Sequence, residues 1–201
     1  AIAETIESRE VLIAALMVLG TVQDTWDDSA GAEKTLLRAM ELASVTPGFN
    51  RRQRILLIAY LGDTQVALGK IAAAELSYRE GLDLAFKLSG PDHIDGAQME
   101  FRLGRLLFDS ARTNEGLGLL EGAHARVIRA RGANNISFLP KILRVESSMR
   151  ATIGQLEDAL PLAEDGLRLI GSAGKNAYVA PLLLQHAAIL IQMGRVSDAK
   201  V

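Results

Sequence analysis

Two pairs of basic residues are the side chains of this sequence best suited to bind an acidic group of a partner. Arg102 and Arg105 lie three residues apart, and so do Lys141 and Arg144. Residues three apart share one face of a helix, and clustered cations bind carboxylates through charge-assisted hydrogen bonds. The alternative is that some of these cations pair with acids of the chain itself and only hold the structure together. The acidic candidates are Glu100, Asp109 and Glu146.

The three histidines do not have the spacing of a metal or catalytic site. His93, His124 and His186 are far apart in the sequence, and there is no cysteine to complete a disulfide or a thiolate metal site. We expect His93 to cap a helix, and His124 and His186 to be hydrogen-bonded packing residues. No metal and no cofactor is expected.

Glycine-rich and acidic motifs also lack the context of an enzyme site. Residues 116–122 resemble a nucleotide-binding fingerprint, but their spacing is wrong and no strand precedes them. Gly69-Lys70 is not a phosphate loop, because Thr64 stands where that motif needs glycine. Paired acids at turns or helix starts favour the helix dipole and meet solvent. They are Asp27-Asp28, Glu157-Asp158 and Glu164-Asp165. The sequence predicts that the protein is not an enzyme.

Composition excludes several classes of partner. The chain has 201 residues, is 49% hydrophobic and carries a net charge of −2, so nucleic acid is not an expected partner. Residues 1–100 hold 9 basic and 15 acidic residues, whereas residues 101–201 hold 13 and 9. This asymmetry is either an ordinary division of surface charge or a polarised binding surface. There is no apolar run of membrane-spanning length and no basic secretory leader, so we expect a cytoplasmic protein that does not bind membranes.

A spacing of 42 residues organises the chain. Leu19-Gly20, Leu61-Gly62 and Leu103-Gly104 are 42 residues apart, twice over. Small residues follow each glycine at a fixed distance, then a bulky residue, then another small one. They are Ala32, Ala74 and Gly116, then Leu36, Tyr78 and Leu120, then Ala39, Gly81 and Ala123. A period of about 20–50 residues indicates stacked units that bury an apolar face only together.

Each unit contains two predicted helices with apolar residues at helical spacing. The turn between them is expected at Gly69, Gly154 and Gly194, with Asp27 and Ala111 in the same place in the first and third units. The small residues Gly20, Gly62, Gly104 and Ser147 are expected to face Ala32, Ala74, Gly116 and Ala159 where the helices cross. We expect units at 13–45, 55–90, 97–132, 140–172 and 180–201, the last one cut off, and hence one all-α domain belonging to a longer protein.

These residues resemble the tetratricopeptide repeat (TPR). The second unit carries its signature most closely, in Leu61-Gly62, Gly69, Ala74, Tyr78 and Gly81-Leu82. The repeat length and the linker 88–95 resemble the long subclass of kinesin light chain, which is common in bacterial regulators. The resemblance implies a right-handed α-solenoid of antiparallel helix pairs. It weakens in the fourth unit, where Glu146-Ser147 replaces Leu-Gly. Pro161 stands near the start of that unit's second helix, so the fourth unit is expected to be kinked or shortened. Pro140 and Pro181 are expected in the first turns of first helices.

The resemblance also implies where a partner binds. In such repeats the first helix of each unit lines a concave groove, whose floor here is apolar with acids early and bases later. The implied contact residues are Tyr60, Asp63, Phe101, Arg102, Arg105, Phe108, Lys141 and Arg144. The expected partner is an extended peptide, a helix or a neighbouring domain, acidic where it meets the cations.

Three functions remain open at this level. The first is a non-enzymatic interaction module of a larger signalling or regulatory protein. The second is a sensor whose groove takes a peptide or small effector and controls a fused kinase or DNA-binding domain. The third is a scaffold that self-assembles through exposed solenoid ends.

Overall fold

A computed structural model describes residues 2–130, 138–171 and 179–199. All regular structure in these residues is α-helical. The helices are α1 (Ile2–Thr25), α2 (Ser29–Ser44), α3 (Arg51–Ala67), α4 (Ile71–Ser89), α5 (Ile94–Asp109), α6 (Thr113–Arg129), α8 (Leu139–Thr152), α9 (Leu156–Gly171) and α10 (Val179–Gln192). The chain divides into two compact units, Ala1–Leu106 and Leu107–Val201, and each is described by itself.

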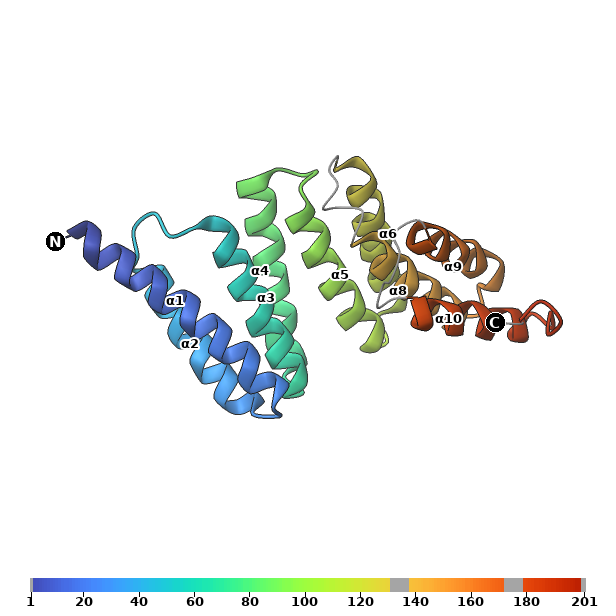
Figure 1. Cartoon of the computed structure of the whole chain (residues 1–201), viewed down its shortest axis with the longest axis horizontal. Coiled ribbons are helices and arrows are strands. Elements are labelled where there is room, and N and C mark those ends of the chain that lie inside the picture. The colour runs from blue at the N-terminus through green and yellow to red at the C-terminus, as the bar shows by residue number, and fades with distance from the viewer. Residues whose placement is uncertain (1, 131–137, 172–178, 200–201) are drawn as a thin grey trace. The chain divides into compact units, whose positions relative to one another are not determined.

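The first unit consists of helix pairs joined by short turns. α1 packs against α2, α3 packs against α4, and α2 also packs against α3 (Figure 1). Side-chain caps mark the starts of α2 and α3. Asp28 accepts a hydrogen bond from the Gly31 amide at 2.9 Å, and Asn50 accepts from the amides of Arg52 and Gln53 at 3.0 and 3.2 Å. These caps satisfy amide groups that lack partners within the helix.

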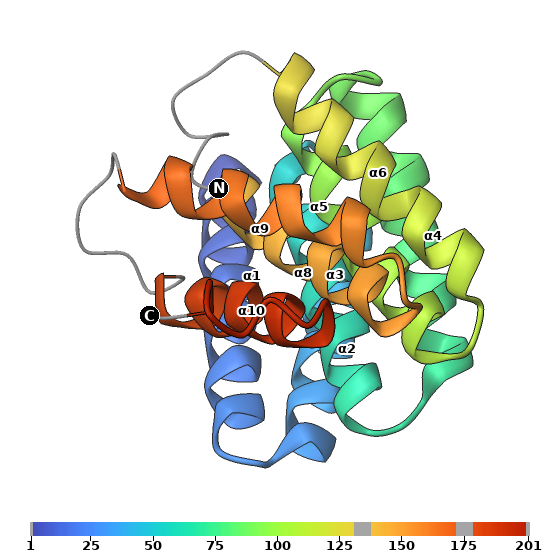
Figure 2. The same ribbon diagram turned by 90° about the vertical axis from the view of Figure 1, so that its right-hand side faces the viewer.

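The second unit repeats the same pairing. α8 packs against α9 and α6, and α10 lies beside α9 (Figure 2). Its core includes Ala159, Ala163 and Ile189, none of which is exposed. Pro140 lies at the start of α8, and Pro181 lies in the first turn of α10, as expected.

The turns between paired helices have the expected left-handed backbone. The φ angles of Gly69, Gly154 and Gly194 are 69, 82 and 75°. Asp27 and Ala111 adopt the same conformation, with φ of 62 and 63°. A non-glycine residue is uncommon there, so the repeat geometry overrides the preference of these two side chains.

Small residues allow the paired helices to approach closely, although their neighbours differ from the prediction in two units. The atoms nearest to a methyl group built on Gly20 or Gly62 belong to Leu36 and Tyr78, at 2.7 and 2.4 Å. They do not belong to Ala32 or Ala74, which are fully buried. The larger side chains reach the glycines because a helical side chain leans over the preceding turn.

In the fourth unit the predicted pair does meet. The Ser147 hydroxyl is fully buried and donates to the Ala159 carbonyl oxygen at 2.8 Å. Serine can therefore stand in place of glycine at this crossing, because its buried hydroxyl has a hydrogen-bond partner.

Some expected boundaries require correction. α1 begins at Ile2 and not near residue 13, and residues 193–199 contain turns but no second helix of the last unit. α9 continues through Pro161 for 16 residues, the same length as α2, so that helix is not shortened. The expected unit ends at 132 and 172 and the end of the chain at 201 lie outside the described residues.

The close approach of the helices at Gly62 predicts that adding one methyl group there lowers the stability of the protein. Gly62→Ala would place Cβ 2.4 Å from Cε1 of Tyr78, whose ring is buried. We expect a loss of about 1–2 kcal/mol in the free energy of unfolding, despite the better helix propensity of alanine. Urea unfolding followed by circular dichroism measures this.

Gly118→Ala is the matched control, because this glycine of α6 has no neighbour within 4 Å of an added methyl group. That variant should be stabilised by about 0.5–1 kcal/mol. Equal effects of the two substitutions would contradict the account of the helix crossing.

Candidate functional site

Two of the predicted contact residues bind each other in the first unit. Arg102 of α5 places Nε 3.1 and 3.2 Å from the two carboxylate oxygens of Asp63 in α3. The Tyr78 hydroxyl of α4 donates to Asp63 Oδ1 at 2.6 Å. We refer to Asp63, Tyr78 and Arg102 as the Asp63 network. Arg102 is thus engaged internally, and its partner is none of the three acids expected from the sequence.

The Asp63 network changes the acidity of Tyr78. This side chain is only 3% exposed. Burial raises the pKa of the Tyr78 hydroxyl well above its ordinary value, and the charge of Asp63 and the hydrogen bond to it raise the pKa further. Arg102 and Arg105 lower it by a smaller amount. Tyr78 therefore remains a neutral donor to Asp63 at every physiological pH.

Arg105 differs from Arg102 in its surroundings. It is exposed, and its guanidinium carbon lies 5.9 Å from the centre of the Phe101 ring. Within the described part of the chain it has no ion pair. Phe101 itself is 2% exposed, which corrects its expected role as a contact residue, since its ring packs inside the protein. Phe108 and Tyr60 are half-buried, and Tyr60 packs against the core of the first unit.

The other two predicted cations belong to the second unit, on α8. Lys141 places Nζ 5.9 Å from the centre of the Phe138 ring. Arg144 is half-buried, and its Nε is inaccessible to solvent and lacks an acceptor among the described residues. A buried donor without a partner costs about 1–3 kcal/mol. Arg150 Nε is also inaccessible to solvent and without an acceptor among the described residues, so this feature does not distinguish Arg144.

The histidines have local roles. The Asp95 amide donates to His93 Nδ1 at 3.2 Å, so His93 caps the start of α5 as expected. His124 Nδ1 lies 3.0 Å from Oε2 of Glu146, and His186 Nε2 lies 3.7 Å from Glu164 Oε1. Both of the latter side chains are partly exposed.

Glu146 is the centre of a charge network that sequence reasoning missed. It is 3% exposed and is held by His124 and by Arg150, whose Nη2 lies 3.4 Å away. Arg150 also contacts Glu121 and donates to Gln155 Oε1 at 3.2 Å. The spacing of Glu146 and Arg150, four residues apart on a helix, was the available signal. This network borders a cavity of about 400 Å³ beside α6.

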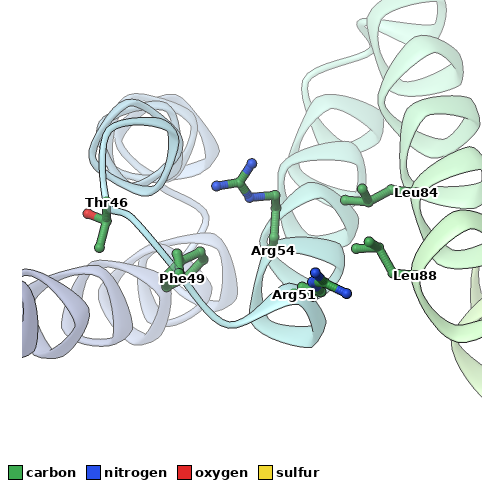
Figure 3. Close-up of a pocket in the computed structure, with 7 residues that line it drawn as sticks. Thr46, Phe49, Arg51, Arg54, Leu84 and Leu88 are labelled. Atoms are coloured by element: carbon green, nitrogen blue, oxygen red, sulfur yellow. The ribbon is translucent and has the colours of Figure 1, made fainter.

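A second cavity lies in the first unit, where the α2–α3 loop meets α3 and α4 (Figure 3). Its volume is about 290 Å³, and it is lined by Thr46, Gly48, Phe49, Arg51, Arg54, Leu84 and Leu88. We call it the junction pocket. Sequence reasoning missed it, although three arginines within residues 51–54 were a visible signal.

The described residues contain no cluster of three or more histidine, cysteine or acidic side chains able to hold a metal ion. Among the same residues, none of the helices combines the length and apolar character required to span a membrane.

Comparison with known proteins supports the fold. No protein-family model matches the chain, and no curated protein matches it by sequence. Among solved structures, BtubC (BKLC) from P. vanneervenii is similar with a TM-score of 0.81 and 12% identity, over 99% of this chain and 87% of that one. A putative kinesin light chain of Podospora anserina with TPR-like repeats has a TM-score of 0.76 and 14% identity, over 95% and 90%.

A third similar structure is a regulator with a bound peptide. It is the Rap conjugation gene regulator of the plasmid pLS20 in complex with the Phr* peptide, with a TM-score of 0.70 and 14% identity. The match covers 92% of this chain but 49% of the regulator. The chain therefore has the helical solenoid fold of TPR-like repeat proteins.

The raised pKa of Tyr78 predicts a loss of stability at high pH. Unfolded tyrosine ionises near pH 10, whereas folded Tyr78 keeps its proton, so the unfolded state loses a proton first and stability falls as pH rises above about 10. The loss from this one residue should be about 1 kcal/mol between pH 10 and pH 11.

Urea unfolding at several pH values measures this, with Tyr78→Phe as the control. The variant keeps the ring but cannot ionise, so its stability should fall less steeply above pH 10. If both proteins show the same pH dependence, Tyr78 is not protected from ionisation.

Proposed function

We propose that this TPR-like chain is a non-enzymatic protein-interaction module that binds an extended peptide, a helix or a neighbouring domain, within a larger signalling or regulatory protein. The observation that carries the proposal is the difference among its first-helix cations. Arg102 is satisfied internally by Asp63, whereas Arg105 and Arg144 have no acidic partner among the described residues.

Arg105 is suited to bind an acidic group of a partner. Its guanidinium lies over the Phe101 ring, which limits its rotation, while the side chain remains exposed. A guanidinium held in place loses less conformational entropy on binding a carboxylate. Arg105 can therefore increase the affinity for an acidic partner as well as its rate of association.

Arg144 supports the same chemistry in the second unit. Its side chain is half-buried and has no acidic partner among the described residues, so the accessible part of the guanidinium can bind a carboxylate of a partner. The first-helix positions also carry exposed apolar side chains, such as Val18 and Val66. The partner that fits combines acidic and apolar residues.

The similar Rap regulator binds the Phr* peptide, which supports a peptide ligand for the present chain at the level of fold. It also favours the second candidate, a sensor in which peptide binding controls a fused domain. The described histidines are engaged in a helix cap and in contacts with Glu146 and Glu164, which supports a role in binding and not in catalysis.

Self-assembly is the third candidate, favoured by one observation. α1 exposes large apolar side chains along its length, and α10 does the same. They are Val11, Leu12, Val18, Leu19 and Val22 on α1, with Trp26 directly after that helix, and Leu184 and Ile191 on α10. Exposed apolar stripes of this kind mark interaction surfaces. A monomer at high concentration in light scattering would argue against the scaffold.

The charge-reversal variants Arg105→Glu and Arg144→Glu test the interaction module. A peptide selected from a displayed random library against the unmodified chain serves as the probe, with binding measured by fluorescence polarisation. Each variant should weaken binding about tenfold or more, because it replaces an attractive cation by a repelling acid.

Arg38→Glu is the matched control. Arg38 is an exposed arginine of α2, a second helix, and its reversal makes the same change in net charge. It should change binding by less than about twofold. Unaltered binding by both test variants, or failure of the library to yield any binder, would refute the binding roles proposed for Arg105 and Arg144.

A further inference from the structure

The junction pocket has the composition of a small-ligand site. Two arginines, Arg51 and Arg54, line it, and no acidic residue does. The remaining walls include Phe49, Leu84 and Leu88. Figure 3 shows Leu84 and Leu88 pointing from α4 toward α3, with Arg51 on the side of Leu88, the Arg54 guanidinium on the side of Thr46, and Phe49 on the loop. A concave site with apolar walls and a few convergent charges is the usual form of a binding pocket.

Arg54 is held in place by the protein. Its Nη2 donates to the Ala43 carbonyl oxygen at 2.6 Å, and its guanidinium carbon lies 6.0 Å from the centre of the Phe49 ring. One edge of the guanidinium therefore donates to the protein itself. Arg54 has no carboxylate partner among the described residues. A planar group fixed in this way can bind a carboxylate with little further ordering.

Arg51 supplies a second, uncommitted charge. It is exposed, and no contact with another described residue engages its guanidinium. The neighbouring Arg52 differs, because it lies 3.5 Å from Asp95 and does not line the pocket. The local field of the pocket is therefore positive, although residues 1–100 as a whole are acidic.

The size of the cavity limits the ligand. A volume of about 290 Å³ is at the lower end for ligand sites, so it suits one small molecule or one amino-acid residue. The leucines and Phe49 favour an aliphatic group beside the charge. A doubly charged phosphate would lose more hydration against these walls than a carboxylate does.

We propose that the junction pocket binds a monocarboxylate with a short aliphatic chain, with Arg54 and Arg51 holding the carboxylate and Leu84 and Leu88 contacting the chain. Two sources share this chemistry: the C-terminal residue of a protein, and a free small acid. Neither Arg105 nor Arg144 lines this pocket, so the proposal does not depend on the interaction proposed for those two cations.

Three probes test the ligand class on the full chain, by NMR titration and isothermal titration calorimetry. N-acetyl-leucine represents a chain terminus, hexanoate a free acid, and N-acetyl-leucinamide the same side chain without charge. We expect saturable binding of the acids and at least about tenfold weaker binding of the amide. Tighter binding of N-acetyl-leucine than of hexanoate identifies a chain terminus, and the reverse identifies a free acid.

The length of the acid tests the apolar walls. From acetate to butyrate to hexanoate, affinity should rise up to about fourfold for each methylene group that is buried. Inorganic phosphate should bind more weakly than hexanoate. Equal binding of amide and acid, no gain with length, phosphate binding as tight as that of hexanoate, or no saturable binding at all would each overturn the proposal.

Arginine variants test whether the acids bind in the junction pocket. Arg51→Met should weaken binding about threefold or more and leave stability unchanged, because this side chain is exposed. Arg54→Met should weaken it about tenfold, but it also removes the bond to Ala43, so Arg51→Met remains the test if that variant unfolds. Arg38→Met is the matched control, since Arg38 lies outside the pocket. Equal affinities of Arg51→Met and Arg38→Met would place the ligand elsewhere.

Discussion

The close approach of two antiparallel helices at Gly62 determines how charge is distributed around it. Because this residue has no side chain, the Tyr78 ring lies where a methyl group would otherwise be, and it is almost fully buried. From there its hydroxyl reaches Asp63, whose carboxylate also holds Arg102 from α5. A packing constraint between α3 and α4 thus determines the partner of a cation on the next helix, and leaves Arg105 without one among the described residues.

Some first-helix cations are paired within the protein, and others remain able to bind a partner. In a stack of repeats, a first-helix cation can be neutralised by the preceding repeat, as Arg102 is by Asp63. Such a pair is partly exposed and contributes little stability by itself, but it removes the cation from partner recognition. In the second unit the occupied side chain is an acid. His124 and Arg150 both contact Glu146, so its carboxylate is not available to a partner. Arg105 and Arg144 also lie on first helices, but neither has an acidic partner among the described residues.

The three solved structures described above share only 12–14% of their residues with this chain. A solenoid tolerates such divergence because each repeat needs few residues of defined size: a small one at the helix crossing, a bulky one against it, and a left-handed turn. The outward-facing residues are then free to change. Fold similarity therefore establishes the fold alone, and the ligand of the junction pocket is argued from Arg51, Arg54 and their apolar neighbours.

Local features of this protein were predictable from its sequence. The helical repeats follow from apolar periodicity, the turns at Asp27 and Ala111 from their register with Gly69, and the cap at His93 from its place before α5. The tertiary structure alone decided that Arg102 meets Asp63, that Phe101 is buried, and that residues 46–54 enclose a cavity with Leu84 and Leu88. The physical reason is range. Periodicity and caps depend on residues within a turn or two of each other, whereas these contacts depend on how separate helices pack, and sequence spacing does not encode that distance.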